Sequence, residues 1–412
     1  MKYKIIDGGV CAPEGFLASG LHAGFKREKK DLALIYSKVP CSVSGMFTKN
    51  IIKAAPIYVT KDHVKDGIAQ AIICNSGNAN CCQFDDGITK AKKTALCLSK
   101  ALKIPENYVL VSSTGIIGKP LNFSLIENNI DDLINKLSSN GSNDAANAIL
   151  TTDKFTKEYA VEFLIDNKKV KLGAISKGSG MVNPNMGTIL SFITTDLCIS
   201  PFILKEALRE CVDVSYNKIS IDGDTSTNDM VLIMANGLAK NTEITSKDKN
   251  YYVFLEALKH LCIFLSKKVA RDGDGATKLI ECTIKNANNN KQAEEFAKCI
   301  INSNIIKASL FNNRIDFGKI LCAITNSNIE FDFNKLNILI SDSKENSINI
   351  LSSGTLVQKI DDNALQKLLS NEEIKLTIDF NEGHSNVTVW GSDLTYEYIR
   401  VTGDYRNLKG GK

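Results

Sequence analysis

The 412-residue sequence contains only four histidines, and its cysteines form no Cys-x-x-Cys pair. Histidines and closely spaced cysteines are the usual protein ligands of zinc, so the sequence gives no support to a metal site of that kind. Its twelve cysteines are scattered, except for the adjacent Cys81 and Cys82. Scattered cysteines in apolar surroundings behave as small buried hydrophobes, and we therefore expect free thiols and no metal.

Long apolar runs and clustered charge are also missing. No segment approaches the roughly 18 consecutive apolar residues that a membrane span requires. Residues 1–9 lack the apolar core of a secretory signal, so we expect a cytoplasmic protein. The net charge of +4 is small, and the lysines are spread thinly rather than gathered in a basic stripe. This pattern argues against nucleic-acid and membrane partners.

The overall composition is that of a globular chain with two domains or lobes. Hydrophobic residues make up 43% and charged residues 23%, which is ordinary for a folded protein. A chain of this length exceeds what one hydrophobic core usually supports. Short apolar runs at 69–74 and 108–112 predict buried strands, and periodic apolar positions predict helices over 88–102 and 250–268. The sequence therefore predicts an α/β fold.

Two segments rich in small polar residues follow the predicted strands. The first, 75–80, reads Asn-Ser-Gly-Asn-Ala-Asn, and its amides could face a cleft or simply close a turn. In the second, 112–118, the Thr114 hydroxyl and the Gly115 amide could form an oxyanion hole, although an ordinary turn fits as well.

Two further segments, 220–229 and 271–278, alternate carboxylates with glycines. The spacing does not suit a calcium loop, because Ala276 and Ile233 fall where oxygen ligands are needed.

The most informative stretch is 177–188, Lys-Gly-Ser-Gly-Met-Val-Asn-Pro-Asn-Met-Gly-Thr, which runs into an apolar, β-branched segment at 189–196. A strained junction of this kind would suit self-cleavage between Gly187 and Thr188. A threonine freed in this way carries its own base, because the new α-amino group can take the hydroxyl proton. A plain loop entering a strand explains the same pattern. No Gly-x-Ser-x-Gly elbow surrounds Ser179.

These motifs resemble the ornithine acetyltransferases of arginine biosynthesis, the ArgJ family. The resemblance rests on the 177–188 run and on further segments in family order along nearly the whole chain. These are 8–16, 31–34, 53–56, 75–80, 113–118, 151–153, 222–229 and 273–278. It implies a two-lobed α/β fold of the N-terminal-nucleophile type, with mixed sheets and packed helices. It also implies cleavage into an α chain (1–187) and a β chain (188–412).

The function implied by the resemblance is transfer of the acetyl group of N-acetylornithine to glutamate through an ester on Thr188. Thr114 and Gly115 would hold the oxyanion, no cofactor would be needed, and acetyl-CoA could be a second donor. The cleaved chains would assemble as an α2β2 heterotetramer. The residues placed at substrate-binding positions are Thr151, Thr152, Lys177, Thr188, Asp274, Thr402 and Asn407.

Several positions depart from the family pattern. Gly187 replaces an alanine, Asp274 replaces a glutamate, and Phe317 replaces a tryptophan. At the C-terminal substrate positions Thr402 and Asn407 stand as if exchanged. These changes bear on substrate choice. Two alternatives stay open: an N-terminal-nucleophile aminopeptidase with the same self-cleavage and, suggested by the altered Asp274, Thr402 and Asn407, a non-catalytic paralogue.

Overall fold

The computed structural model describes residues 3–183 and 189–403, which form two compact units. The described part of the first unit comprises residues 3–183, 189–217 and 224–269. The second unit comprises residues 218–223 and 270–403. The expectation of two lobes in an α/β fold is confirmed.

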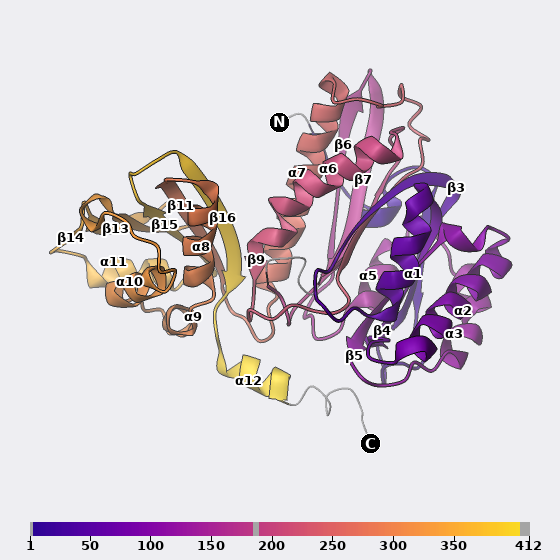
Figure 1. The fold of residues 1–412 in the computed structure, drawn as a ribbon, viewed down its shortest axis with the longest axis horizontal. Coiled ribbons are helices and arrows are strands. Elements are labelled where there is room, and N and C mark those ends of the chain that lie inside the picture. The colour runs from indigo at the N-terminus through magenta and orange to yellow at the C-terminus, as the bar shows by residue number, and fades with distance from the viewer. Residues whose placement is uncertain (1–2, 184–188, 404–412) are drawn as a thin grey trace. The chain divides into compact units, whose positions relative to one another are not determined.

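Within its described residues the first unit is built on a nine-stranded mixed sheet (Figure 1). The strand order is β1-β6-β7-β8-β10-β3-β4-β5, and β2 pairs with β3. Only β8–β10 and β4–β5 are parallel pairs among them. The strands are β1 (Tyr3–Ile6), β2 (Phe16–Leu21), β3 (Leu32–Phe47), β4 (Ile68–Asn78), β5 (Val109–Ile116), β6 (Lys157–Ile165), β7 (Lys168–Lys177), β8 (Leu190–Thr195) and β10 (Met230–Ala235).

Both faces of this sheet are covered, as the continuous apolar runs in its strands require. In β3, Leu32 and Leu34 belong to one core cluster, whereas Ala33 and Ile35 belong to the cluster on the opposite face. The 16-residue length of β3 lets it pair with β2 and β4 in its first half and with β10 in its second. It therefore ties the two halves of the sheet together.

The helices of the first unit supply the apolar layers. Helices α1 and α2 pack against each other and against β5, whereas α5 packs on β2 and β3 (Figure 1). They are α1 (Ala55–His63), α2 (Phe84–Leu102), α3 (Ser124–Glu127), α4 (Ile130–Asn135), α5 (Ser142–Ile149), α6 (Pro201–Asp213) and α7 (Lys249–Arg271). The predicted helices over 88–102 and 250–268 are confirmed as α2 and α7, and Ala91, Ala95 and Leu98 are fully buried.

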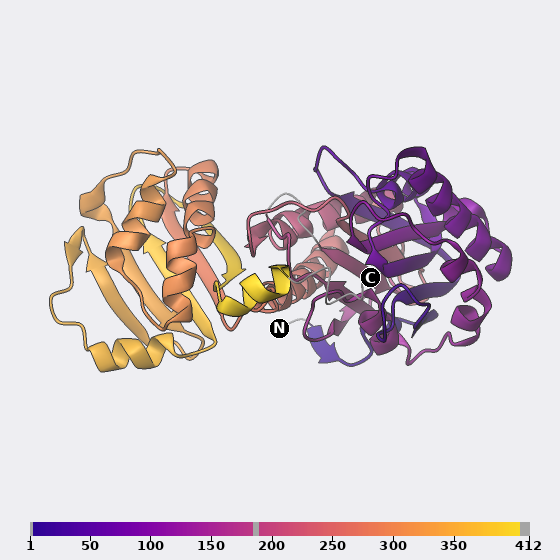
Figure 2. The ribbon, with the colours of Figure 1, turned by 90° about the horizontal axis from the view of Figure 1, so that it is seen from below.

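The second unit has one sheet with helices packed against it (Figure 2). Its described strands follow the order β14-β13-β12-β15-β11-β16-β9. In β11, Ile280, Cys282 and Ile284 enter the core while the residues between them are less buried, which is the period-two pattern of a sheet with one covered face. The strands are β9 (Ile219–Ser220), β11 (Leu279–Ala287), β12 (Asn337–Asp342), β13 (Ser347–Ser352), β14 (Thr355–Leu356), β15 (Glu373–Asp379) and β16 (Ser385–Ser392). The helices are α8 (Asn290–Ile301), α9 (Asn304–Phe311), α10 (Phe317–Thr325), α11 (Asp362–Leu369) and α12 (Tyr396–Gly403).

The boundary between the units differs from the predicted chain division at 187/188. Strand β8, which begins two residues after Thr188, pairs with β7 in the register Lys177↔Leu190 to Leu172↔Thr195. On its other side β8 pairs with β10. The predicted α and β chains therefore share one sheet, and its backbone hydrogen bonds would hold them together after a cut.

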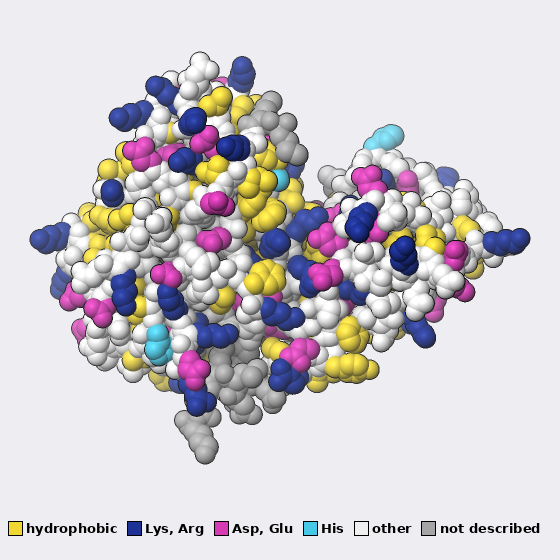
Figure 3. Space-filling model, turned by 180° about the vertical axis from the view of Figure 1, so that it is seen from behind, with side chains coloured by type: hydrophobic (Ala, Val, Ile, Leu, Met, Phe, Trp, Pro, Cys, Tyr) yellow, Lys and Arg dark blue, Asp and Glu magenta, His cyan; other side chains and the backbone are white. Residues whose placement is uncertain are grey.

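The surface is mixed in charge. On the face shown in Figure 3, lysine and arginine side chains alternate with aspartate and glutamate. In residues 3–183 and 189–403, no helix is both long and apolar enough to cross a membrane. All twelve cysteines are free thiols, and Cys82 and Cys322 are exposed rather than buried.

Candidate active site

A cluster of buried polar side chains lies at the end of β7, around Lys177. This residue is only 2% exposed, and its ammonium group donates to two hydroxyls. Lys177 Nζ lies 2.8 Å from Thr151 Oγ1 and 3.5 Å from Thr114 Oγ1. The structure therefore brings together three residues that the sequence predicted for the site, from segments far apart in the chain.

Asp153 is the acidic centre of this cluster. Its Oδ1 accepts from Lys157 Nζ at 2.8 Å and from the Gly178 amide at 2.9 Å. Its Oδ2 accepts from the Thr151 amide at 2.9 Å and lies 4.0 Å from Lys177 Nζ. Burial acts to raise the pKa of Asp153, but the facing Lys157 and Lys177 ammonium groups outweigh it and hold the pKa far below the usual range. Asp153 thus stays ionised and fixes the backbone at Thr151 and at Gly178, the residue after Lys177.

The two candidate threonines take different partners. Thr151 directs its hydroxyl to Lys177, whereas Thr152 Oγ1 lies 2.6 Å from Ser179 Oγ. Both threonines are half-buried. Of the two, Thr151 is the one whose side chain belongs to the lysine cluster.

The polar segments after the predicted strands are strand ends rather than loops, which corrects the sequence-based expectation. Strand β4 runs on to Asn78 and β5 to Ile116, and they pair in parallel, Ser76 with Thr114 and Gly77 with Gly115. The amide side chains in this region bond to the protein itself, since Asn75 Nδ2 donates to the Asn78 carbonyl at 2.9 Å. Side-chain bonds of this kind add to the pairing of β4 with β5.

Thr114 and Gly115 lie at the end of β5, beside Lys177. Thr114 is buried and Gly115 is half-buried. Gly115 has φ +135°, and a Cβ there would stand 2.3 Å from the Gly77 carbonyl carbon, so only glycine fits. This close approach of β4 fixes the position of the Thr114 hydroxyl and the Gly115 backbone, the two groups predicted to face an oxyanion.

The segment 220–229 supports the same region. Asn228 Nδ2 donates to the Ala79 carbonyl at 2.6 Å and to the Ser113 carbonyl at 2.8 Å. Next to it, Asp229 Oδ1 accepts from the amide of Ile189 at 2.9 Å. Ile189 directly follows Thr188 in the sequence, so Asp229 holds the first described residue after the predicted cleavage position.

Asp229 is a buried carboxyl, and one of its two oxygens, Oδ2, accepts no hydrogen bond from the described residues. Burial raises the pKa of Asp229 well above its usual range, and the bond from Ile189 offsets this only in part. Burial therefore favours the neutral form of this carboxyl.

Two predicted substrate residues, Asp274 and Thr402, belong to the second unit. Asp274 is half-buried in the turn before β11, and Thr402 is exposed in the last turn of α12. The turn and the helix meet at Gly275, where a Cβ would stand 2.4 Å from the Tyr398 amide nitrogen. Gly187, Thr188 and Asn407 lie outside the described residues.

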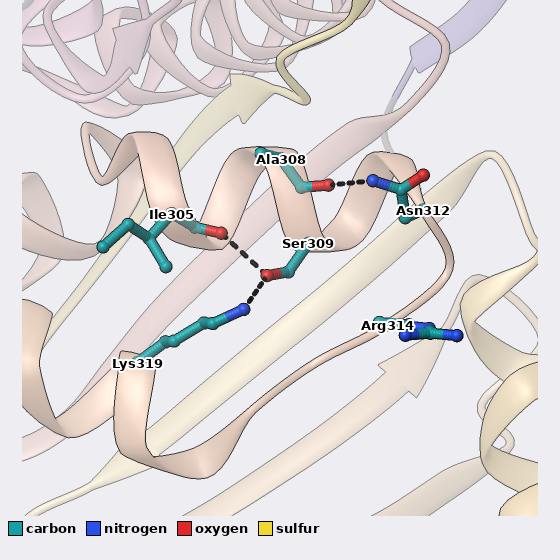
Figure 4. Close-up of a pocket in the computed structure, with 6 residues that line it drawn as sticks. All are labelled: Ile305, Ala308, Ser309, Asn312, Arg314 and Lys319. Carbon is teal, nitrogen blue, oxygen red and sulfur yellow. Dashed lines mark hydrogen bonds between the residues drawn. The ribbon is translucent and has the colours of Figure 1, made fainter.

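A pocket of about 680 Å³ in the second unit contains none of the predicted site residues (Figure 4). Lys319 Nζ lies 2.9 Å from Ser309 Oγ across it, which fixes α10 against α9. The residues that line it are Ile305, Ala308, Ser309, Asn312, Arg314 and Lys319. The neighbouring Phe317, which departs from the family pattern, packs partly buried against the core of this unit. Nowhere in the described part of the chain do three His, Cys, Asp or Glu side chains gather as metal ligands would.

Sequence reasoning did not assign a role to Asp153, Lys157 or Asp229. The spacing of Asp153 and Lys157 was one available signal, because oppositely charged residues four apart often pair. Nothing local pointed to Asp229, whose partner Ile189 is forty positions away. These residues complete the site without changing its predicted centre.

The fold and the cluster together define a two-unit α/β protein with a buried lysine–threonine site at the ends of paired strands. Comparison with known proteins gives its family. The sequence profile of the ArgJ family matches residues 17–407.

Two relatives match almost the whole chain. The arginine biosynthesis bifunctional protein ArgJ 1 of Clostridium acetobutylicum is 43% identical over 393 residues, which cover 95% of this chain and 96% of the relative. The ArgJ protein of Caldanaerobacter subterraneus is 41% identical over 403 residues, which cover 98% of this chain and 100% of the relative. The chain belongs to the ArgJ family.

Two solved structures match about half of the chain. The arginine biosynthesis bifunctional protein of Bacillus halodurans is 37% identical, covers 45% of this chain and 99% of its own, and has a TM-score of 0.42. The ornithine acetyltransferase of Mycobacterium tuberculosis, solved with ornithine, is 32% identical. The match covers 46% of this chain and 100% of that structure, with a TM-score of 0.42.

Proposed function

We propose that this protein is a self-processing acyltransferase of arginine biosynthesis. It moves the acetyl group of N-acetylornithine to glutamate through an acetyl ester on Thr188. The support is its full-length similarity to relatives named arginine biosynthesis bifunctional proteins, together with the buried contact of Lys177 with Thr114 and Thr151.

The chemistry consists of two acyl transfers through one ester. Cleavage between Gly187 and Thr188 gives Thr188 a free α-amino group, which takes the proton of its own hydroxyl. The hydroxyl oxygen then attacks the acetyl carbonyl, and the amine of ornithine leaves with a proton. The amine of glutamate attacks the ester in turn, which releases N-acetylglutamate and restores Thr188.

The cluster at the end of β7 would stabilise both transition states. Thr114 and Gly115 would donate to the oxyanion, and a preorganised donor of this kind contributes about 10²–10³-fold in rate. Lys177, fixed by Asp153 and Thr151, would hold the substrate close to them. The family resemblance also assigns Asp274, Thr402 and Asn407 to substrate binding.

Four finer points belong to the same proposal. The reaction uses no cofactor, and acetyl-CoA acts as a second acetyl donor. The cleaved chains form an α2β2 heterotetramer that works in the cytoplasm.

The test is an acetyl-transfer assay with purified protein. N-acetylornithine or acetyl-CoA is the donor, and glutamate is compared with other amines as acceptor. We expect N-acetylglutamate to form much faster than free acetate. Release of acetate alone would instead identify an aminopeptidase-like hydrolase, and no turnover of either donor would identify a non-catalytic paralogue.

A further inference from the structure

A second buried lysine, Lys26, lies next to the Lys177 cluster, and nothing in the proposed mechanism uses it. It belongs to the segment between β2 and β3, which Asp31 folds into a fixed turn. The carboxylate of Asp31 accepts from the amides of Ala23 at 2.6 Å, Gly24 at 3.2 Å and Lys26 at 2.8 Å. The Asp31 carboxylate therefore fixes the backbone from which the Lys26 side chain extends.

The ammonium group of Lys26 is buried but incompletely bonded. The residue is 8% exposed, and its Nζ donates to the Leu150 carbonyl at 2.9 Å. Among the described residues no carboxylate lies within ion-pair distance of it. An ammonium group has three N–H donors, so two remain for a ligand.

The position of Lys26 points to the substrate site. Leu150, its hydrogen-bond partner, directly precedes Thr151, whose hydroxyl accepts from Lys177. The aliphatic stem passes over β4, where Lys26 Cγ lies 3.2 Å from the point where a Cβ on Gly77 would stand. Gly77 is the register partner of Gly115, so Lys26 lies against both the lysine cluster and the strand ends of the predicted oxyanion hole.

The three buried lysines of this region differ in their ion pairs. Lys157 and Lys177 pair with the buried Asp153, whereas Lys26 pairs with no carboxylate among the described residues. Burial also raises the pKa of the nearby Asp229 well above the usual range. Burial likewise lowers the pKa of Lys26 to about 8, and the nearby Lys177 adds to that effect. A buried ammonium group without a carboxylate partner is costly unless an anion joins it.

We propose that Lys26 binds the α-carboxylate of the amino-acid substrate, next to Lys177. The proposal rests on the proposed function, in which N-acetylornithine and glutamate occupy one site in turn. Both compounds carry an α-carboxylate, so one pair of lysines can anchor the donor and then the acceptor. The ligand chemistry is a carboxylate that supplies the missing negative charge and two hydrogen-bond acceptors.

The first experiment compares two donors on wild-type protein and on Lys26→Met. One donor is N-acetylornithine, and the other is N-acetyl-1,4-diaminobutane, the same compound without its carboxylate. We expect Lys26→Met to lower kcat/KM for N-acetylornithine about 10–100-fold, as loss of a charged hydrogen bond does, and to leave the second donor within about twofold. An equal loss with both donors, or no loss with either, would overturn the proposal.

Two controls accompany this comparison. Lys29 is an exposed lysine of the same segment, so Lys29→Met should leave both donors unchanged. Lys26→Arg, which keeps the charge, should retain most of the preference for the carboxylate. If wild-type protein transfers acetyl from neither donor, the proposed function itself fails, and that outcome is separate from any result with Lys26.

A second experiment needs no variant, in case Lys26→Met does not fold. Wild-type protein is treated with an amine-labelling reagent, and labelling of each lysine is measured by mass spectrometry. N-acetylornithine should protect Lys26 several-fold and leave Lys29 labelled, whereas the donor without a carboxylate should protect neither. Equal labelling of Lys26 with and without N-acetylornithine would contradict the assignment.

Discussion

Buried lysines in this protein differ in how completely their ammonium groups are bonded. In the second unit Lys278 Nζ has three acceptors, which are Asn313 Oδ1 at 2.8 Å and the carbonyls of Leu369 at 2.6 Å and Asn371 at 3.1 Å. In the first unit Lys177 has two hydroxyls, one of them at 3.5 Å, and Lys26 has one carbonyl. A fully bonded ammonium is typical of a structural element, whereas incompletely bonded buried groups are expected where a ligand binds.

The largest expected difference is between Lys177→Met and Lys278→Met. Lys177→Met should lower kcat/KM about 10²–10³-fold, the loss expected when a buried charged contact to substrate is removed, with a small effect on stability. Lys278→Met leaves three acceptors without a donor, so it should cost about 3 kcal/mol or more in the free energy of unfolding. Thermal unfolding and steady-state kinetics of both variants check this. Similar stability losses for the two variants would remove the distinction between Lys177 and Lys278.

Thr114→Ala tests the oxyanion role within the first unit. Losing one preorganised donor should lower kcat by about 10²-fold with little change in KM. Thr114→Ser keeps the hydroxyl and serves as the matched control, with activity within a few-fold of wild type. Equal activity of the alanine and serine variants would show that the hydroxyl does not act on the reacting group.

Asp229 should matter for cleavage through its bond to Ile189. Asp229→Ala removes that bond and should slow conversion of the precursor into two chains about tenfold. Asp229→Asn retains an oxygen acceptor and should be cleaved at nearly the wild-type rate. Denaturing gels over a time course measure both rates, and normal cleavage of Asp229→Ala would contradict this role.

The same residue gives a pH dependence with a definite sign. Burial raises the pKa of Asp229 above its unfolded value, so its contribution to stability is full below the unfolded pKa and falls as pH rises toward the folded pKa. Asp229→Asn removes this dependence. Its stability relative to wild type should therefore grow as pH rises from about 4 toward neutrality, the region above the unfolded pKa of an aspartate. A constant difference across that range would show that Asp229 is ionised in the folded protein.

The smallest effect separates the two neighbouring threonines. Thr151 contacts Lys177, whereas Thr152 contacts Ser179, so Thr151→Val should lower kcat/KM about tenfold and Thr152→Val about threefold or less. Kinetics on the two valine variants decide which threonine belongs to the site. The reverse order would move the substrate contact to Thr152.

Periodicity predicted the elements whose side chains pack locally. Helices α2 and α7 follow from their apolar stripes, and β8 follows from the β-branched run after residue 188. The small polar residues at the ends of β4 and β5 are typical of turns, but the structure pairs them as strands. Long-range bonds, such as that of Ser113 Oγ to Asn75 Oδ1 at 2.6 Å, stabilise them as strands, and such bonds leave no local pattern.

Long-range contacts also limit what the sequence predicts about the site. Thr114, Gly115, Thr151 and Lys177 were found through a motif resemblance, and the structure brings them together. The roles of Asp153 and Asp229 depend on partners that only the fold brings near. Lys26 stands in a lysine-rich stretch of the sequence, where lysine side chains are expected to be exposed to solvent.

The most direct test of the central claim is the mass of the β chain after incubation with N-acetylornithine in the absence of glutamate. The proposed mechanism predicts one added acetyl group per β chain, located on Thr188 and removed when glutamate is supplied. An uncleaved chain that nevertheless transfers acetyl, or an acetyl group found on a residue other than Thr188, would contradict it.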